Sequence, residues 1–292
     1  MDDPRLPPWL VKPLSDPEET RGVRRALKTH GLSTVCDEAR CPNRVECFAR
    51  GTATFMILGD LCTRDCGFCA VGHGAPVAPD RGEPARVAAA ARELGLGFVV
   101  LTSVTRDDLP DGGADHFART VRALREALPE AGIEVLVPDF AGDAGALDAV
   151  MASGPDVLGH NVETVERLYD IVRRGAGYAR SLGVLERAAA SGGVAHVKSA
   201  LMLGLGEERR EVESTLRDVR ATGADIAYLG QYLRPSARHA PVERFVPPGE
   251  FEELKAYALS LGFGWVSSGP FVRSSYHAES AVAAAGSAGA NI

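Results

Sequence analysis

Residues 61–70 read Leu61-Cys62-Thr63-Arg64-Asp65-Cys66-Gly67-Phe68-Cys69-Ala70. The gaps of three and two residues between these cysteines let one short loop reach three corners of a cubic [4Fe-4S] cluster. Such a cluster normally takes four thiolates, one for each iron. A loop with three cysteines therefore either borrows a ligand of another kind or leaves one iron open for a substrate.

The other cysteines form a second set, Cys36-x4-Cys41-x5-Cys47, so the six cysteines of the 292-residue chain make two triplets. We name them the 36–47 triplet and the 62–69 triplet. Zinc is less favoured, because it prefers closed sites of four ligands, often built from paired CxxC segments. Disulfides are less favoured because the chain is long and starts without an apolar signal segment. Isolated core cysteines would lie in an apolar stretch, and these lie among Arg, Asp, Asn and Glu. We therefore expect two iron–sulfur clusters, each short of one cysteine ligand.

Composition limits the partners of the chain. With 32 basic and 39 acidic residues the formal net charge is −7, which argues against a nucleic-acid-binding surface. No apolar run approaches the roughly 20 residues that cross a bilayer, so we expect a soluble protein without a membrane partner. Clustered reduced thiols predict a cytoplasmic location. For the oligomeric state we expect a monomer.

Short apolar runs alternate with amphipathic stretches from Thr52 onward. Strands are predicted at 54–58, 98–103, 133–138, 157–161, 196–203 and 226–231. Helices are predicted at 83–94, 114–127, 144–152, 165–172, 182–190, 208–222 and 249–261. This order predicts an α/β fold, a partial (βα)6 TIM-like barrel of parallel strands. Function in such barrels lies where the strands end, and the 62–69 triplet directly follows the first strand.

The domain organisation is predicted from the same pattern. Residues 1–50 are expected to form an arm, a helix around 16–30 and the loop of the 36–47 triplet. Residues 51–262 are expected to form the partial barrel. Residues 263–292 are expected to form a C-terminal extension, disordered from Ala281 onward because that stretch is rich in Ala, Gly and Ser. Both extensions should lie over the barrel mouth.

The 62–69 triplet, with Phe68 before its last cysteine, resembles the cluster loop of the radical S-adenosylmethionine (SAM) enzymes. The resemblance implies that Cys62, Cys66 and Cys69 bind three irons and that SAM occupies the fourth. It also implies that an electron delivered through this cluster cleaves SAM to methionine and a 5′-deoxyadenosyl radical, which abstracts hydrogen from unactivated carbon.

A narrower resemblance runs from about residue 30 to residue 277. The segment Val35-Cys36-Asp37-Glu38-Ala39-Arg40-Cys41-Pro42-Asn43 is similar to the auxiliary-cluster motif of the lipoyl synthase family. Further similar segments are 51–58, 105–108, 111–113, 137–140, 160–163, 203–207, 230–236 and 269–276. The resemblance implies insertion of sulfur at C6 and C8 of an octanoyl chain that is amide-linked to a lysine of a lipoyl carrier domain.

The same resemblance implies the sulfur source and its ligands. Cys36, Cys41 and Cys47 would hold an auxiliary [4Fe-4S] cluster that gives up its sulfur, with Ser275 as the fourth ligand and Ser274 as the runner-up. A hydroxyl is a poor match for iron in a thiolate-ligated cluster, so this bond should break readily when that iron must leave. Arg273 could anchor this cluster or a lid, or form a surface ion pair.

The implied partners are an octanoylated lipoyl carrier domain (a 2-oxoacid dehydrogenase E2 or the glycine cleavage H protein), a reductant such as flavodoxin or ferredoxin, and an iron–sulfur carrier protein. One alternative is a sulfurtransferase resembling biotin synthase, which acts on a free small molecule. A non-enzymatic alternative is an electron-transfer or cluster-carrier protein. Such a carrier would need neither an open iron nor a whole barrel.

Polar side chains at or near strand ends are candidates for SAM or substrate contact. Asn161 and Glu163 could hold the ribose hydroxyls or the methionyl ammonium, or could only form a turn and a helix cap. Thr102, Ser103 and Arg106 lie at or after the second strand, and Arg106 could instead pair with Asp107 or Asp108.

Two further candidates lie in later strands. Lys198 interrupts an apolar strand, so its amine needs an anion, which could be the SAM carboxylate, the substrate or a structural partner. Gln231 ends the sixth strand and is expected to hydrogen-bond to SAM or the substrate.

Overall fold

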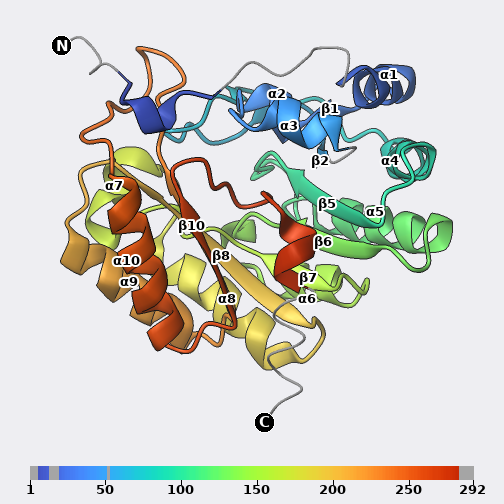
Figure 1. The fold of residues 1–292 in the computed structure, drawn as a ribbon. Helices are drawn as coiled ribbons and strands as arrows, with labels where there is room; N and C mark the ends of the chain where they lie inside the picture. Colours follow the sequence, from blue (N-terminus) through green and yellow to red (C-terminus); the bar gives the residue numbers. More distant parts are fainter. Residues whose placement is uncertain (1–5, 13–19, 51–52, 283–292) are drawn as a thin grey trace.

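The computed structural model describes residues 6–12, 20–50 and 53–282. Its centre is a sheet with the strand order β1-β2-β5-β6-β7-β8-β9-β10. All neighbours from β2 to β10 pair in parallel, and only β1 pairs with β2 antiparallel. The helices that connect the parallel strands lie outside the curved sheet (Figure 1). This is the parallel α/β arrangement of a partial barrel, which confirms the predicted fold class.

The strands of the main sheet are β1 (Ser33–Thr34), β2 (Thr54–Ile57), β5 (Phe98–Ser103), β6 (Gly132–Leu136), β7 (Val157–Gly159), β8 (His196–Leu203), β9 (Ile226–Gln231) and β10 (Trp265–Gly269). A separate pair is formed by β3 (Leu61–Cys62) and β4 (Gly72–His73). The helices are α1 (Arg21–His30), α2 (Val35–Glu38), α3 (Arg44–Ala49), α4 (Glu83–Glu93), α5 (Ala114–Ala127), α6 (Ala144–Met151), α7 (Tyr169–Val172), α8 (Tyr178–Ser191), α9 (Arg209–Ala221) and α10 (Pro248–Ser260). Short 3-10 turns are η1 (Pro8–Leu10), η3 (Phe140–Gly142) and η4 (Glu166–Leu168).

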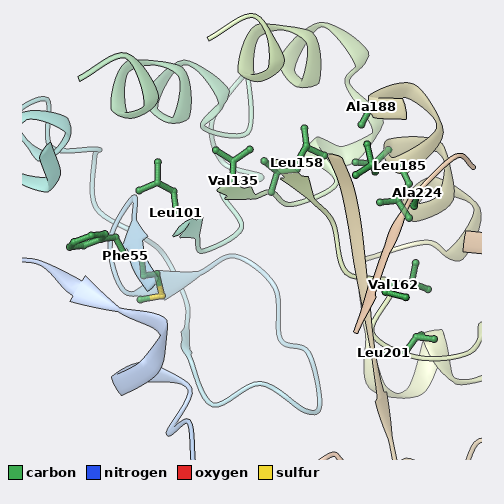
Figure 2. Packing of buried hydrophobic residues seen from close by; sticks show 14 of the residues in the cluster. Phe55, Leu101, Val135, Leu158, Val162, Leu185, Ala188, Leu201 and Ala224 are labelled. Atoms are coloured by element: carbon green, nitrogen blue, oxygen red, sulfur yellow. The ribbon is translucent and has the colours of Figure 1, made fainter. Parts of the chain in front are cut away.

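The core explains why these apolar runs become parallel strands. All residues of β2 and β9 are buried, as expected for strands that are covered on both faces. Figure 2 shows Leu101, Val135 and Leu158, which come from successive strands, in a row that faces the helices. Burial of these side chains holds the helices on the outside, and the strand ends are left to form the site.

Strand β10 is a correction to the sequence analysis. It pairs in parallel with β9 and adds a seventh parallel strand. It lies within residues 263–292, which were predicted to be an extension outside the barrel. Its sequence Trp265-Val266-Ser267-Ser268-Gly269 has only two large apolar side chains, so no apolar run marked it as a strand. Because β10 belongs to the sheet, the chain after it starts at the barrel mouth.

The chain ends differ from the prediction in smaller ways. Helix α1 begins at Arg21, and residues 13–19 lie outside the described residues. Residues 278–282 are helical, and Ala281 is buried beside Tyr228 and Val272, so the disorder predicted from Ala281 is wrong for its first two residues. Residues 283–292 lie outside the described part of the chain. No helix in the described residues is long and apolar enough to span a membrane.

Candidate active site

A cavity of about 530 Å³ lies at the carboxyl ends of the parallel strands. It is lined by strand-end residues such as Ser103 of β5 and Leu136 of β6. Every cysteine of the chain also lines it, and so do Ser274 and Ser275 from the segment after β10. The fold therefore brings both triplets and the C-terminal serines to one cavity.

The backbone of the 62–69 triplet is held from two sides. The amide of Gly67 donates to the Val172 carbonyl at 2.9 Å, and the Gly67 carbonyl accepts from the amide of Ala240 at 2.7 Å. Nε2 of His239 donates to the Cys69 carbonyl at 2.9 Å. The amides of Arg64 and Thr105 donate to Sγ of Cys62 at 3.4 and 3.3 Å. Hydrogen bonds of the last kind tune the potential of a cluster.

Arg64 anchors the same loop to the strand ends. Its guanidinium donates to both carboxylate oxygens of Asp107 at 2.7 and 2.8 Å and to Asp139 at 2.7 Å. The Asp139 side chain is fully buried. Burial opposes its ionisation, but the hydrogen bond and charge of Arg64 lower the pKa of Asp139 to about 2. The loop is thus tied to the segments that follow β5 and β6.

The 36–47 triplet lies on the short helices α2 and α3 and on the turn between them. Thr34 caps α2, since its hydroxyl accepts from the amide of Asp37 at 3.2 Å. The amide of Cys41 donates to the Cys36 carbonyl at 3.0 Å and that of Cys47 to the Asn43 carbonyl at 2.9 Å. These local bonds turn the three thiols toward the same cavity.

The chemistry of the thiols fits iron–sulfur clusters. Burial raises the pKa of Cys36 and Cys69 to about 11 and that of Cys47 and Cys66 to about 12. Such thiols become thiolates when the charge of a metal compensates. In the described residues no three Cys, His, Asp or Glu side chains converge on a single ion. A cubic cluster spreads its thiolates over separate irons, whereas zinc gathers them on one ion.

Five of the predicted SAM-contacting residues line the cavity: Thr102, Ser103, Asn161, Glu163 and Gln231. Nδ2 of Asn161 donates to Oε1 of Glu163 at 3.0 Å. Oδ1 of Asn161 and Oγ of Ser103 are buried and have no hydrogen-bond partner among the described residues. Thr102 is already engaged, because its hydroxyl donates to the Leu136 carbonyl. Unpaired buried oxygens in a cavity lining are places where a ligand can donate.

Glu163 has an unusual backbone and an unusual carboxyl group. Its φ is +69°, a left-handed conformation that costs a non-glycine residue free energy and is often found at functional sites. Bonds to the Ala200 carbonyl and from the Met202 amide hold it against β8. Burial raises the pKa of the Glu163 carboxyl. A cation beside it would restore the ionised form.

Arg106 and Lys198 are corrections. Arg106 is 1% exposed and donates to Asp108 and to two backbone carbonyls. The alternative prediction, that Arg106 pairs with Asp107 or Asp108, is therefore confirmed for Asp108. Lys198 is paired with buried Glu134, because it lies near the start of β8 at the amino end of the barrel. Neither belongs to the described residues that line the cavity.

Gln231 lines the cavity, and its side-chain nitrogen is fully used. It donates to the carbonyls of Leu203, Tyr232 and Arg244 and accepts from the amide of Val246. It joins β9 to the loop that follows it. Its nitrogen is not free to donate to SAM, and its contact with SAM or the substrate stays a prediction.

Arg64, Asp139 and Arg173 also line the cavity, although none of them was predicted as a site residue. Arg173 donates to Tyr169 and Ser181, and its charge opposes the effect of burial on the pKa of Cys66. Sequence signals existed for two of them, since Arg64 lies within the cysteine loop and Asp139 directly follows the predicted strand 133–138. Arg273 lines the cavity and donates to the Val272 carbonyl at 2.6 Å, which leaves its predicted role open.

Known proteins resemble this chain in sequence and fold. The Radical SAM superfamily matches residues 56–219. Lipoyl synthase of Symbiobacterium thermophilum is 54% identical over 95% of this chain and 87% of its own length. That of Methylococcus capsulatus is 53% identical over 97% of this chain and 88% of its own. Among solved structures, methylornithine synthase has a TM-score of 0.53 at 16% identity, covering 87% of this chain and 79% of its own. Streptococcus suis SuiB bound to a precursor peptide has a TM-score of 0.57 at 11% identity, covering 92% and 57%.

The fold and the cysteine loop thus define a radical SAM enzyme. Within that superfamily the chain belongs to the lipoyl synthase family. The family confirms the predicted enzyme class and the predicted cofactors, SAM and two [4Fe-4S] clusters. The two structural neighbours support the fold alone.

Proposed function

We propose that the chain inserts sulfur at C6 and C8 of an octanoyl group on the lysine of a lipoyl carrier domain. The observation that carries the proposal is the shared cavity of the two triplets and the C-terminal serines. Cys62, Cys66 and Cys69 would hold the cluster whose open iron takes SAM. Cys36, Cys41 and Cys47, with Ser275, would hold the auxiliary cluster as sulfur source.

The chain's own residues anchor the cluster loop, offer contacts to SAM and supply a positive charge near the thiols. When bound, SAM and its cluster supply a 5′-deoxyadenosyl radical. Arg64 keeps the cluster loop against β5 and β6. Asn161 and Ser103 offer unpaired oxygens to the hydroxyls or the ammonium of SAM. Arg173 places a positive charge near Cys66, which favours the thiolate form that a cluster requires.

Membership of the lipoyl synthase family supports a protein-bound substrate. The acceptor would be the lipoyl domain of a 2-oxoacid dehydrogenase E2 or the glycine cleavage H protein, presented at the barrel mouth. A flavodoxin or ferredoxin would supply electrons, and an iron–sulfur carrier would rebuild the auxiliary cluster. A reducing cytoplasm suits such thiols. No observation favours the biotin-synthase-like alternative with a free small substrate.

An anaerobic assay tests this function. The chain is reconstituted with iron and sulfide and given SAM, dithionite and an octanoyl-lysine peptide, with free octanoic acid as the matched control. We expect 5′-deoxyadenosine and lipoyl-lysine with the peptide only. Absence of deoxyadenosine would remove the radical chemistry, and deoxyadenosine without sulfurated peptide would remove the substrate assignment.

A further inference from the structure

Lys12, on the N-terminal arm, contacts two segments that are far apart in the sequence. Its Nζ donates to Oε2 of Glu46 at 2.8 Å and to Oδ1 of Asn43 at 2.6 Å. The same ammonium lies 4.7 Å from the ring centroid of Phe271 and 5.7 Å from that of Tyr276. One cation thus joins the 36–47 triplet to the segment after β10 by ionic and cation–π contacts.

These partners also bind one another. The hydroxyl of Tyr276 donates to Oε1 of Glu46 at 2.7 Å, so each carboxylate oxygen of Glu46 has a different donor. Nδ2 of Asn43 donates to the Phe271 carbonyl at 2.6 Å, and Asn43 is 1% exposed. We name this set of Lys12, Asn43, Glu46, Phe271 and Tyr276 the Lys12 junction. Its polar atoms satisfy one another, which fixes one arrangement of the three segments.

The junction lies beside the residues that matter for the auxiliary site. Asn43 and Glu46 lie between Cys41 and Cys47, and Tyr276 directly follows Ser275. A serine hydroxyl is a weak ligand for iron in a thiolate-ligated cluster. Such a ligand binds well only when the scaffold already holds it in place. Otherwise the conformational entropy lost on ordering a free segment would exceed the free energy gained from the iron–oxygen bond.

We propose that Lys12 is a positioning residue that holds the serine-bearing segment 271–276 against the 36–47 triplet. This inference rests on the proposed role of that triplet and adds the N-terminal arm to the site. In this role Lys12 acts through its contacts with Asn43, Glu46 and Tyr276.

Hydrogen exchange of the iron-free chain tests the contact directly. The variant Lys12→Met keeps an unbranched apolar stem, one heavy atom shorter, and removes the charge, and Lys12→Arg keeps the charge. Lys28→Met, on an exposed turn of α1, is the matched control. We expect exchange in residues 271–277 to be about threefold to tenfold faster in Lys12→Met, unchanged in Lys28→Met and close to normal in Lys12→Arg. Unchanged exchange in Lys12→Met, or an increase spread evenly over the chain, would overturn the proposal.

Iron retention tests the consequence. In a background with Cys62, Cys66 and Cys69 changed to Ala, bound iron reports the 36–47 triplet alone. We expect Lys12→Met to lose iron to a chelator several times faster than Lys28→Met, with Lys12→Arg close to the background. Equal rates would contradict the positioning role. Neither readout requires sulfur insertion. If the chain fails to insert sulfur, hydrogen exchange still tests the Lys12 contact. If exchange contradicts the contact, the sulfur-insertion assay still tests the proposed function.

Discussion

At the scale of single residues, the two triplets share a cavity but differ in their surroundings. Cys66 lies near Arg173, and its loop is held by the Val172 carbonyl and by His239, while Cys47 lies near Tyr276 of the serine-bearing segment. We predict that Cys66→Ala abolishes both SAM cleavage and sulfur insertion. Cys36→Ala should keep SAM cleavage and stop sulfur insertion. The measurement is 5′-deoxyadenosine and lipoyl-lysine from the same anaerobic reaction, and loss of deoxyadenosine in both variants would contradict separate roles.

The two C-terminal serines can also be distinguished. Both line the cavity, and only Ser275 precedes Tyr276, which is bonded to Glu46. We predict that Ser275→Ala reduces iron retained by the 36–47 triplet, whereas Ser274→Ala leaves it near the parent value. Iron content after chelator treatment, with the 62–69 triplet removed, measures this. The opposite order would move the ligand role to Ser274.

His160 predicts a pH dependence of stability. It is 1% exposed, its Nδ1 donates to the Val137 carbonyl at 2.8 Å, and Nε2 faces Ser181 at 3.1 Å. Burial, and then the charge of Arg173, lower the pKa of His160 to about 3, although Asp139 opposes this. The unfolded chain, with a pKa of about 6.5, therefore binds a proton that the folded chain does not bind.

The free energy of unfolding should therefore be fully maintained above about pH 6.5 and fall at lower pH, by up to about 1.4 kcal/mol per pH unit from this group. In His160→Gln the slope between about pH 6.5 and pH 5 should be smaller. Urea unfolding of the iron-free chain, followed by circular dichroism at several pH values, measures it. Equal slopes in parent and variant would show that His160 does not carry the effect.

At the scale of elements, Arg64 fixes the position of the cluster loop through its bonds to Asp107 and Asp139. Arg64→Ala leaves the buried carboxylate of Asp139 with Arg180 at 3.2 Å as its remaining cation. We predict a loss of about 2 kcal/mol in the free energy of unfolding, because a charge-assisted bond to a buried group is removed. Iron bound by the 62–69 triplet should fall too. Arg187→Ala, which breaks an exposed pair with Asp148, should cost at most about 0.5 kcal/mol. Equal losses in the two variants would argue against the anchor.

Most strands and helices could be predicted from the sequence, because a run or a periodic pattern of apolar residues indicates which side chains are buried. The strands β5, β8 and β9 and the helix α5 begin and end at their predicted residues. Strand β10 could not be predicted, because its serines are held in the sheet by pairing with β9. Lys198 shows a related limit, since position along a strand decides whether a side chain meets the cavity or the amino end of the barrel.

At the scale of the whole molecule, local spacing predicted the cysteine sites and missed the long-range contacts around them. Three cysteines in one loop report their chemistry without any knowledge of the fold. The bond between Glu46 and Tyr276 joins residues 230 positions apart, and no spacing rule connects them. The same holds for Arg64 and Asp139, which meet only because β2 and β6 end at the same edge of the sheet.

The central claim is that the 62–69 triplet serves radical formation while the 36–47 triplet carries the sulfur source. The most direct measurement is a single turnover after reconstitution with isotopically heavy sulfide, removal of free sulfide, and addition of SAM, dithionite and octanoyl-lysine peptide. We predict lipoyl-lysine that carries heavy sulfur in the parent chain and none in Cys36→Ala, with deoxyadenosine formed in both. Product sulfur of natural mass, or labelled product from Cys36→Ala, would contradict this account.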